Sequence, residues 1–191
     1  GLREEARQRE YAWLTGDVRA EDRATQYGHR AAIVLFTGSA QTGKTFLARR
    51  VEALLVADSR HAYLLEGENL LQGLDADLSA ADPSFAAERV RRYGEVARLL
   101  IDTGLIVVST SKTFGINYQR MAEMIRTLVQ PAPVIAVHMS RAGEEPPPNT
   151  DLHFAGPQDF DAAARQILEE LKRRGVLIQP SGTKSTIQYS I

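Results

Sequence analysis

The segment Gly38-Ser39-Ala40-Gln41-Thr42-Gly43-Lys44-Thr45 constrains this chain more than any other feature. It satisfies the pattern G-x-x-x-x-G-K-[ST], in which glycines let the backbone curl around phosphates and the lysine reaches their oxygens. An apolar run over 32–36 precedes it, and a stretch with helical periodicity over 46–56 follows it. Strand, glycine loop and helix is the context that the pattern requires. The segment therefore predicts a binding loop for a nucleoside triphosphate.

Each part of this loop has its own expected role. The backbone N–H groups of residues 38–45 point at the phosphates, and the following helix adds the positive end of its dipole. Lys44 bridges the β- and γ-phosphates as the catalytic cation, and the Thr45 hydroxyl coordinates Mg²⁺. No Asn-Lys-x-Asp pattern of the guanine-reading kind is present, which favours ATP as the nucleotide. A glycine-rich turn with an incidental lysine is the alternative.

Strand-like and helix-like stretches alternate along the rest of the chain. They cover residues 61–65, 86–103, 105–108, 118–129, 133–139 and 160–174. This alternation predicts a three-layer α/β P-loop fold with a mainly parallel sheet. We expect a helical arm over 1–30, in which Tyr11, Trp13 and Leu14 are the only clustered apolar group, and whose packing partner the sequence does not identify. A kinase-like domain over 31–175 and a C-terminal tail over 176–191 follow.

Composition narrows the class of protein. With 43% hydrophobic and 25% charged residues the chain can form a core, and a net charge of -1 supplies no broad footprint for nucleic acid or an anionic membrane. Cysteine is absent, which excludes a disulfide framework. No apolar run is long enough to span a bilayer and no signal peptide pattern begins the chain, so we expect a cytoplasmic protein. The missing initiator Met leaves open whether the chain belongs to a longer protein.

The ends of two predicted strands favour a kinase over a motor protein. A helicase or transport ATPase would place an aspartate after a hydrophobic strand, whereas the strand at 105–108 is followed by Ser109-Thr110-Ser111. Glu66 and Glu68 follow the second strand, where ligands of parallel sheets bind. Either carboxylate is placed to accept the proton of an acceptor hydroxyl. The alternative is that both are solvated loop residues.

An ordered series of segments resembles the adenylylsulfate (APS) kinase family. The segments are Phe36 to Thr45, Tyr63 to Asn69, Gly73-Leu74, Asp77-Leu78 and Arg91 to Leu99. Members of that family transfer phosphate from ATP, with magnesium, to the 3′-hydroxyl of APS to make PAPS, and they often occur fused to a sulfate-activating enzyme. The resemblance implies that ATP and a small anionic acceptor such as APS bind here, with Glu66 as the base. It leaves open both a fused or associated sulfate adenylyltransferase and a homo-oligomer.

The acceptor side departs from the family pattern. Glu66-Gly67-Glu68-Asn69 replaces Asp-Gly-Asp-Asn, Leu71 replaces an arginine, and a long basic lid is shortened to residues 141–145. The candidate acceptor-binding residues are Glu68, Asn69, Arg89, Arg92 and Lys112. Three hypotheses stay open: an active APS kinase, a nucleotide-binding regulatory domain with weakened transfer, and a kinase for another small acceptor. The four histidines show no metal-ligand spacing, and we expect His138 to be a packed core residue.

Overall fold

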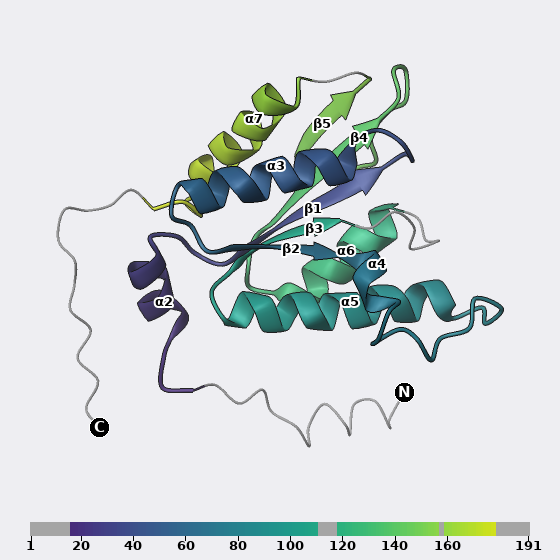
Figure 1. Cartoon of the computed structure of the whole chain (residues 1–191), viewed down its shortest axis with the longest axis horizontal. Coiled ribbons are helices and arrows are strands. Elements are labelled where there is room, and N and C mark those ends of the chain that lie inside the picture. Colours follow the sequence, from purple (N-terminus) through teal and green to yellow (C-terminus); the bar gives the residue numbers. More distant parts are fainter. Residues whose placement is uncertain (1–15, 111–117, 157–158, 179–191) are drawn as a thin grey trace.

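A five-stranded parallel sheet organises the chain (Figure 1). The computed structural model describes residues 16–110, 118–156 and 159–178. The strand order is β2-β3-β1-β4-β5. The strands are β1 (Ala32–Gly38), β2 (Ala62–Glu66), β3 (Ile106–Thr110), β4 (Val134–Ser140) and β5 (Leu152–Ala155). The helices are α2 (Ala20–Tyr27), α3 (Lys44–Ala57), α4 (Gly67–Leu70), α5 (Phe85–Asp102), α6 (Tyr118–Val129) and α7 (Phe160–Arg173). The predicted α/β fold is confirmed.

Helices cover both faces of the sheet. Helices α3 and α7 pack on one face and helices α5 and α6 on the other (Figure 1). All seven residues of β1 are buried, and alternate side chains enter opposite cores: Val34 and Phe36 join the α3/α7 core, whereas Ile33 and Leu35 join the α5/α6 core. A strand that is buried on both faces has no polar side, and the sequence of β1 is therefore a nearly continuous apolar run.

Two short elements were missing from the sequence prediction. β5 has four residues, of which only Phe154 is buried, so it carries no apolar run that periodicity could detect. It pairs with β4 at the edge of the sheet. α4 is a single turn that begins at Gly67, directly after Glu66. Glu66 and α4 together form an acidic turn, residues 66–70, that carries both predicted acidic residues.

The first residues of the predicted tail pack on the domain. Val176 and Leu177 belong to the α3/α7 core. The backbone here pairs with the entry to β1: Arg30 N donates to Val176 O at 2.8 Å, and Ile178 N donates to Gly28 O at 3.0 Å. The segment thus ties the two ends of the domain together. Residues 179–191 of the predicted tail lie outside the described part of the chain.

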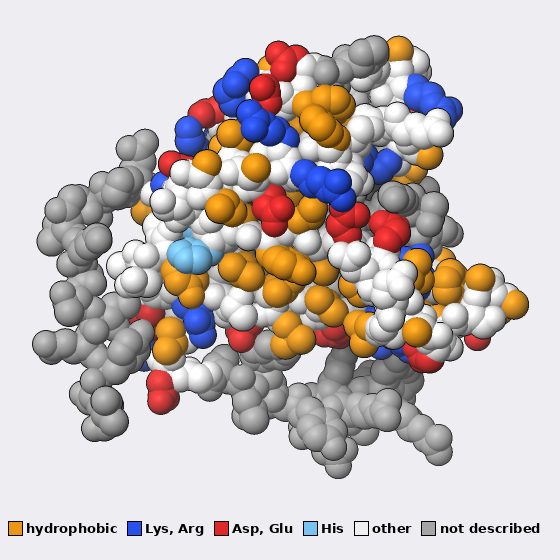
Figure 2. All heavy atoms as spheres, viewed as in Figure 1, with side chains coloured by type: hydrophobic (Ala, Val, Ile, Leu, Met, Phe, Trp, Pro, Cys, Tyr) orange, Lys and Arg blue, Asp and Glu red, His pale blue; other side chains and the backbone are white. Residues whose placement is uncertain are grey.

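The edge strand β2 is exposed but blocked on its open side. Hydrophobic side chains gather over β2 and α5 on the face shown in Figure 2, and Tyr63 is 48% exposed. The Glu52 carboxylate accepts a hydrogen bond from Leu64 N at 2.6 Å. A side chain that accepts a hydrogen bond from a backbone N–H on the open side of an edge strand hinders pairing with another strand. Across the described residues, no helix is long and apolar enough to cross a membrane.

Candidate nucleotide-binding and phosphotransfer site

The phosphate loop, residues 38–45, joins β1 to α3 as predicted. Gly38 has φ of +121°, and a Cβ there would lie 1.8 Å from Met139 O, so only glycine fits beside β4. Gly43 has φ of +88°, and a Cβ there would lie 2.6 Å from Cζ of Phe160. Both glycines of the motif are therefore needed for packing as well as for the curl of the loop. The loop ends at the N-terminus of α3, where backbone N–H groups and the helix dipole favour an anion.

Lys44 lies inside the curl of the phosphate loop. Its Nζ donates hydrogen bonds to the carbonyl oxygens of Gly38, at 3.0 Å, and Ser39. Only 8% of Lys44 is exposed, and burial lowers the pKa of its ammonium group while the negative charge of Glu68 opposes that shift. The lysine is thus held next to the backbone that would surround a phosphate.

Three residues outside the predicted site lie next to the phosphate loop and support it. The Tyr118 hydroxyl, on α6, donates to Gly38 O at 2.8 Å, and its ring lies edge-on to His138 with centroids 5.3 Å apart. Thr37 Oγ1 and His138 Nδ1 form a hydrogen bond at 2.9 Å. Burial lowers the pKa of His138, with His153 and Lys44 adding to the effect. His138 is the packed residue that we predicted.

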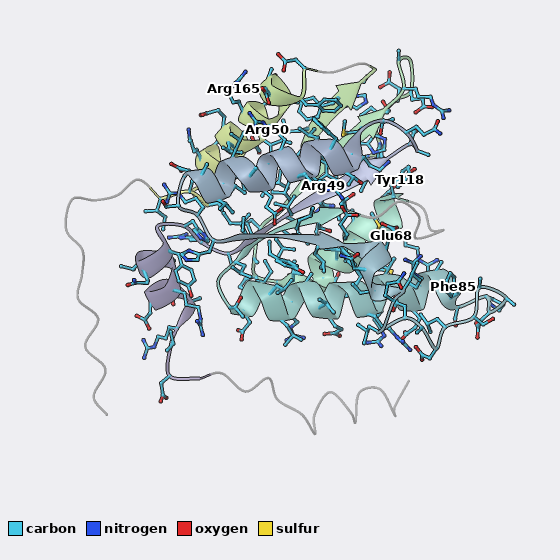
Figure 3. All side chains as sticks on the ribbon, viewed as in Figure 1. Arg49, Arg50, Glu68, Phe85, Tyr118 and Arg165 are labelled. Atoms are coloured by element: carbon cyan, nitrogen blue, oxygen red, sulfur yellow. The ribbon has the colours of Figure 1, made fainter. Side chains whose placement is uncertain are left out.

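The two candidate carboxylates lie at the carboxyl end of β2. Glu66 ends the strand, and its side chain is 13% exposed while it accepts a hydrogen bond from Arg49 at 3.3 Å. Glu68 follows in α4, close enough to Lys44 for its charge to raise the pKa of that lysine. Figure 3 shows Arg49, Glu68 and Tyr118 around the same end of the sheet. The fold therefore brings the acidic pair and the phosphate loop to one edge, as parallel strands require.

Arg89 lies beneath the acidic turn instead of facing an open site. It is 3% exposed, pairs with Asp75 at 3.5 Å and donates to Gly67 O at 3.5 Å. Its guanidinium group also lies 5.5 Å from the centre of the Phe85 ring. A buried arginine with these contacts positions the turn that carries Glu66 and Glu68.

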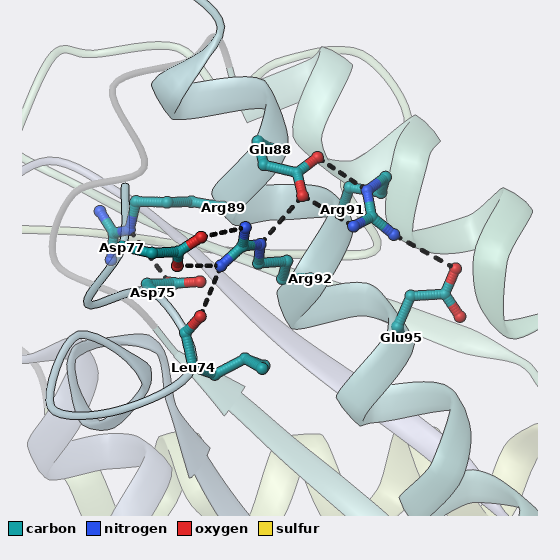
Figure 4. A network of polar contacts seen from close by, with 8 residues as sticks. All are labelled: Leu74, Asp75, Asp77, Glu88, Arg89, Arg91, Arg92 and Glu95. Atoms are coloured by element: carbon teal, nitrogen blue, oxygen red, sulfur yellow. Dashed lines mark hydrogen bonds and ion pairs between the residues drawn. The ribbon is translucent and has the colours of Figure 1, made fainter. Parts of the chain in front are cut away.

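Arg92 also has partners within the chain. It binds both oxygens of Asp77 and donates to Glu88 and to Leu74 O (Figure 4). Hydrogen bonds from Arg91 and Arg92 lower the pKa of Glu88 to about 2, and those from Asp77 and Glu88 raise the pKa of Arg92. The arginine cluster thus anchors the segment between α4 and α5.

Two acceptor-side candidates remain, of which the structure describes only Asn69. Asn69 is exposed and lines a shallow groove with Tyr63 and Leu70 beside β2. Lys112 lies outside the described residues. Of the four acceptor-side candidates that the structure describes, Glu68 is the one whose charge acts on Lys44 of the phosphate loop.

An acidic residue outside the set of predicted site residues contacts the phosphate loop directly. Ser39 Oγ donates to Glu144 Oε2 at 2.6 Å, and the same oxygen accepts from Arg141 N at 3.1 Å. The hydrogen bond from Ser39 is the main reason that the pKa of Glu144 is lowered. Glu144 belongs to the shortened segment after β4, 105 residues from its partner. No local sequence pattern relates residues so far apart, so only the fold could show this contact.

The parallel sheet, the phosphate loop after β1 and the buried Lys44 define a P-loop nucleotide-binding protein of the α/β class. Comparisons with known proteins identify the family. The adenylylsulphate kinase family matches residues 30–146, and this chain belongs to that family.

Individual relatives agree with this assignment. An adenylyl-sulfate kinase of Yersinia pestis is 29% identical over 194 residues, which cover 86% of this chain and 89% of the relative. One from Shewanella amazonensis is 38% identical over 128 residues, or 67% of this chain and 63% of the relative. A mutant APS kinase of Mycobacterium tuberculosis has a TM-score of 0.65 at 29% identity, covering 75% of this chain and 99% of that structure. Its complex with AMPPNP and APS, at 24% identity and a TM-score of 0.63, supports the fold.

Proposed function

We propose that this chain is an ATP-dependent phosphotransferase that phosphorylates the 3′-hydroxyl of adenylylsulfate, giving PAPS and ADP. The observation that carries the proposal is the phosphate loop with Lys44 in its curl, in a chain that belongs to the adenylylsulphate kinase family. The relatives named adenylyl-sulfate kinase support the choice of acceptor.

Nucleotide binding follows from the geometry of the loop. Lys44 exchanges the carbonyl oxygens of Gly38 and Ser39 for phosphate oxygens, which keeps its hydrogen bonds satisfied in both states. The Thr45 hydroxyl, in the first turn of α3, is the group that would hold Mg²⁺. A single protein oxygen is compatible with this ion, because Mg²⁺ beside a nucleotide keeps several waters and takes phosphate oxygens. When bound, the ion neutralises charge on the phosphates.

Phosphoryl transfer then uses the acidic turn. The acceptor oxygen forms a bond to the γ-phosphorus, the bond from that phosphorus to the β,γ-bridging oxygen breaks, and ADP leaves. The acceptor proton passes to the carboxylate of Glu66, which the hydrogen bond from Arg49 orients. Lys44 stabilises the negative charge that moves onto ADP. Arg89 keeps the turn in place through Gly67 O.

The proposal extends to partners and location. A sulfate adenylyltransferase, fused or associated, is the class of enzyme that would supply adenylylsulfate to this site. A cytoplasmic location and a homo-oligomer remain predictions.

A nucleotide-binding regulatory domain is the second candidate, and the observation that favours it is the pairing of two acceptor-side arginines with carboxylates of the chain itself. Arg89 pairs with Asp75, and Arg92 pairs with Asp77 and Glu88. These ion pairs weaken an anion site on the acceptor side. A kinase for another small acceptor would also keep the phosphate loop while losing the contacts to adenylylsulfate.

One titration series separates these candidates. Calorimetry with magnesium and a non-hydrolysable ATP analogue, then with APS, is followed by an assay for PAPS in the same preparation. Binding of both ligands with PAPS formation supports the kinase. Nucleotide binding without PAPS formation favours a regulatory domain. If ADP still forms when other hydroxyl compounds are supplied, the result favours a kinase for another acceptor. Absence of nucleotide binding contradicts the role of Lys44.

The role of Glu66 has its own test. Glu66→Gln should lower turnover by roughly 100-fold or more, the range for loss of a general base, with little change in ATP affinity. Glu123→Gln makes the same chemical change on the exposed face of α6 and serves as the control. Equal losses of binding and turnover in Glu66→Gln would assign a metal-binding or structural role instead.

A further inference from the structure

Arg49 reaches the proposed base from helix α3. Along β2, Leu64 packs on the α3/α7 core and Leu65 enters the α5/α6 core. Side chains two apart in a strand share a face, so Glu66 points to the side of α3. Arg49 Nη2 donates to Glu66 Oε1 at 3.3 Å, at the end of the sheet where Figure 3 also labels Glu68. The α3 side chain three residues further on, Glu52, binds Leu64 N, so this stripe of the helix faces β2.

Most of the Arg49 guanidinium group remains accessible. The side chain of Arg49 is 68% exposed, whereas that of Glu66 is 13% exposed. In the part of the chain that the structure describes, Glu66 is the one partner of this guanidinium group. An arginine has five N–H donors in a planar fork, and a phosphate or sulfate group can take two of them at once. A pair this exposed contributes only about 0–1 kcal/mol to stability, so stability does not account for its position beside the base.

Other cations near the acidic turn are committed or distant. Arg89 and Arg92 pair with carboxylates of the chain, and Lys44 lies in the curl of the phosphate loop. Arg141 follows β4, and the order β2-β3-β1-β4 places that strand three spacings, about 14 Å, from β2. Among these five cations, Arg49 is the one that both touches the proposed base and keeps donors for a ligand.

We propose that Arg49 binds the anionic group of the acceptor while it keeps its hydrogen bond to Glu66, and so places the acceptor hydroxyl at the base. The inference rests on the proposed function, which brings that hydroxyl to Glu66. The phosphate loop follows β1, two strand spacings or about 10 Å from β2, which leaves room for the transferred phosphoryl group. The acceptor class is a hydroxyl compound that carries a phosphate or phosphosulfate group, and adenylylsulfate belongs to this class.

Calorimetry of adenylylsulfate binding, with magnesium and the ATP analogue present, tests this role without turnover. Arg49→Gln should weaken binding by roughly 10- to 150-fold, the range for loss of a hydrogen bond to a charged group. The preference for adenylylsulfate over adenosine should fall by the same factor, because adenosine has the hydroxyls without the anion. Arg49→Lys keeps the charge but loses the fork, and should lie between the two chains.

Arg50→Gln is the matched control. It removes the same charge from the next residue of α3, which pairs with Asp161 of α7 at 2.6 Å and so faces away from β2. It should leave the affinity for adenylylsulfate unchanged. Circular dichroism checks that each variant keeps the fold.

A double-mutant cycle separates direct contact from action through the base. If Arg49 only orients Glu66, then Arg49→Gln should cause no further loss of adenylylsulfate affinity in a chain that already carries Glu66→Gln. Direct contact predicts that the loss persists in that background, because the anion still loses its partner.

Four results would overturn the proposal: no binding of adenylylsulfate to the unmodified chain, unchanged affinity in Arg49→Gln, an equal loss in Arg50→Gln, or a loss that disappears in the Glu66→Gln background. Failure of the proposed kinase activity is distinguishable from these results. A chain that binds adenylylsulfate through Arg49 and forms no PAPS contradicts the kinase alone. A chain that forms PAPS with no effect of Arg49→Gln on binding contradicts only the role of Arg49.

Discussion

Replacing Tyr93 by phenylalanine tests how the acidic turn is supported. Tyr93 lies on α5 and is fully buried. Its hydroxyl donates to Leu65 O at 2.6 Å and lies 2.7 Å from Ser109 Oγ, so it links α5 to β2 and β3. Leu65 is the residue before Glu66, and the loss of this hydrogen bond therefore acts directly below the proposed base.

The expected loss of stability in Tyr93→Phe follows from the burial of the hydroxyl group that is removed. Removing one partner of a buried hydrogen bond leaves the other group without full compensation, which costs about 1–3 kcal/mol. The ring itself is retained in Tyr93→Phe, so no large cavity adds to this cost. For a domain of this size, 1 kcal/mol corresponds to roughly 2–4 °C in melting temperature. We therefore expect Tyr93→Phe to melt about 2–12 °C below the unmodified chain.

Urea unfolding measures the change. The midpoint should fall while the slope of free energy against urea stays constant, because the same surface is exposed on unfolding. Tyr63→Phe removes the same atom from an edge-strand side chain that is 48% exposed, and it should change the midpoint little. Equal shifts in the two variants, or no shift in Tyr93→Phe, would refute the assignment of a stabilising role to this buried hydroxyl.

Three further predictions concern the phosphate loop and the response to pH. Glu144→Gln should tighten binding of the ATP analogue by about two- to fivefold at low salt, because it removes a negative charge from the loop while keeping a hydrogen-bond acceptor. Glu145→Gln is the control. Weaker binding in Glu144→Gln would show that the carboxylate helps to order the loop. Lys44→Met should weaken that binding by roughly 10- to 150-fold with the fold retained by circular dichroism, whereas unchanged affinity would contradict the phosphate role. Burial lowers the pKa of His29, whose Nε2 accepts a hydrogen bond from His61 N, so the folded state favours the neutral ring. The stability from this ring is complete above a pH of about 6.5 and is lost as the pH falls below it, which unfolding at successive pH values can measure; His29→Gln should flatten that dependence.

Local chemistry made much of the site predictable. The phosphate loop is one continuous segment, and its glycines, lysine and threonine act through backbone geometry that adjacent residues specify. The continuous apolar runs at β1, β3 and β4 likewise indicate strands buried on both faces. Glu66 could be placed near the loop because parallel strands bring their carboxyl ends to one edge.

Contacts between distant segments were decided by the tertiary structure alone. The edge strand β5 carries too few apolar residues to be detected, and Val176 and Leu177 enter the core only because the chain returns to the start of β1. Whether an arginine reaches a ligand or a neighbouring carboxylate depends on packing, and Arg89 and Arg92 both have carboxylate partners within the chain.

The sequence by itself determined the class of fold, the phosphate loop and the family, because each rests on residues that lie next to one another or recur at a fixed spacing. The tertiary structure decided that Glu144 rests on Ser39, that Tyr118 supports Gly38 and that Arg49 reaches Glu66. These features depend on the distance between segments that are far apart in the chain, and this distance is set only when the sheet and its covering helices pack together.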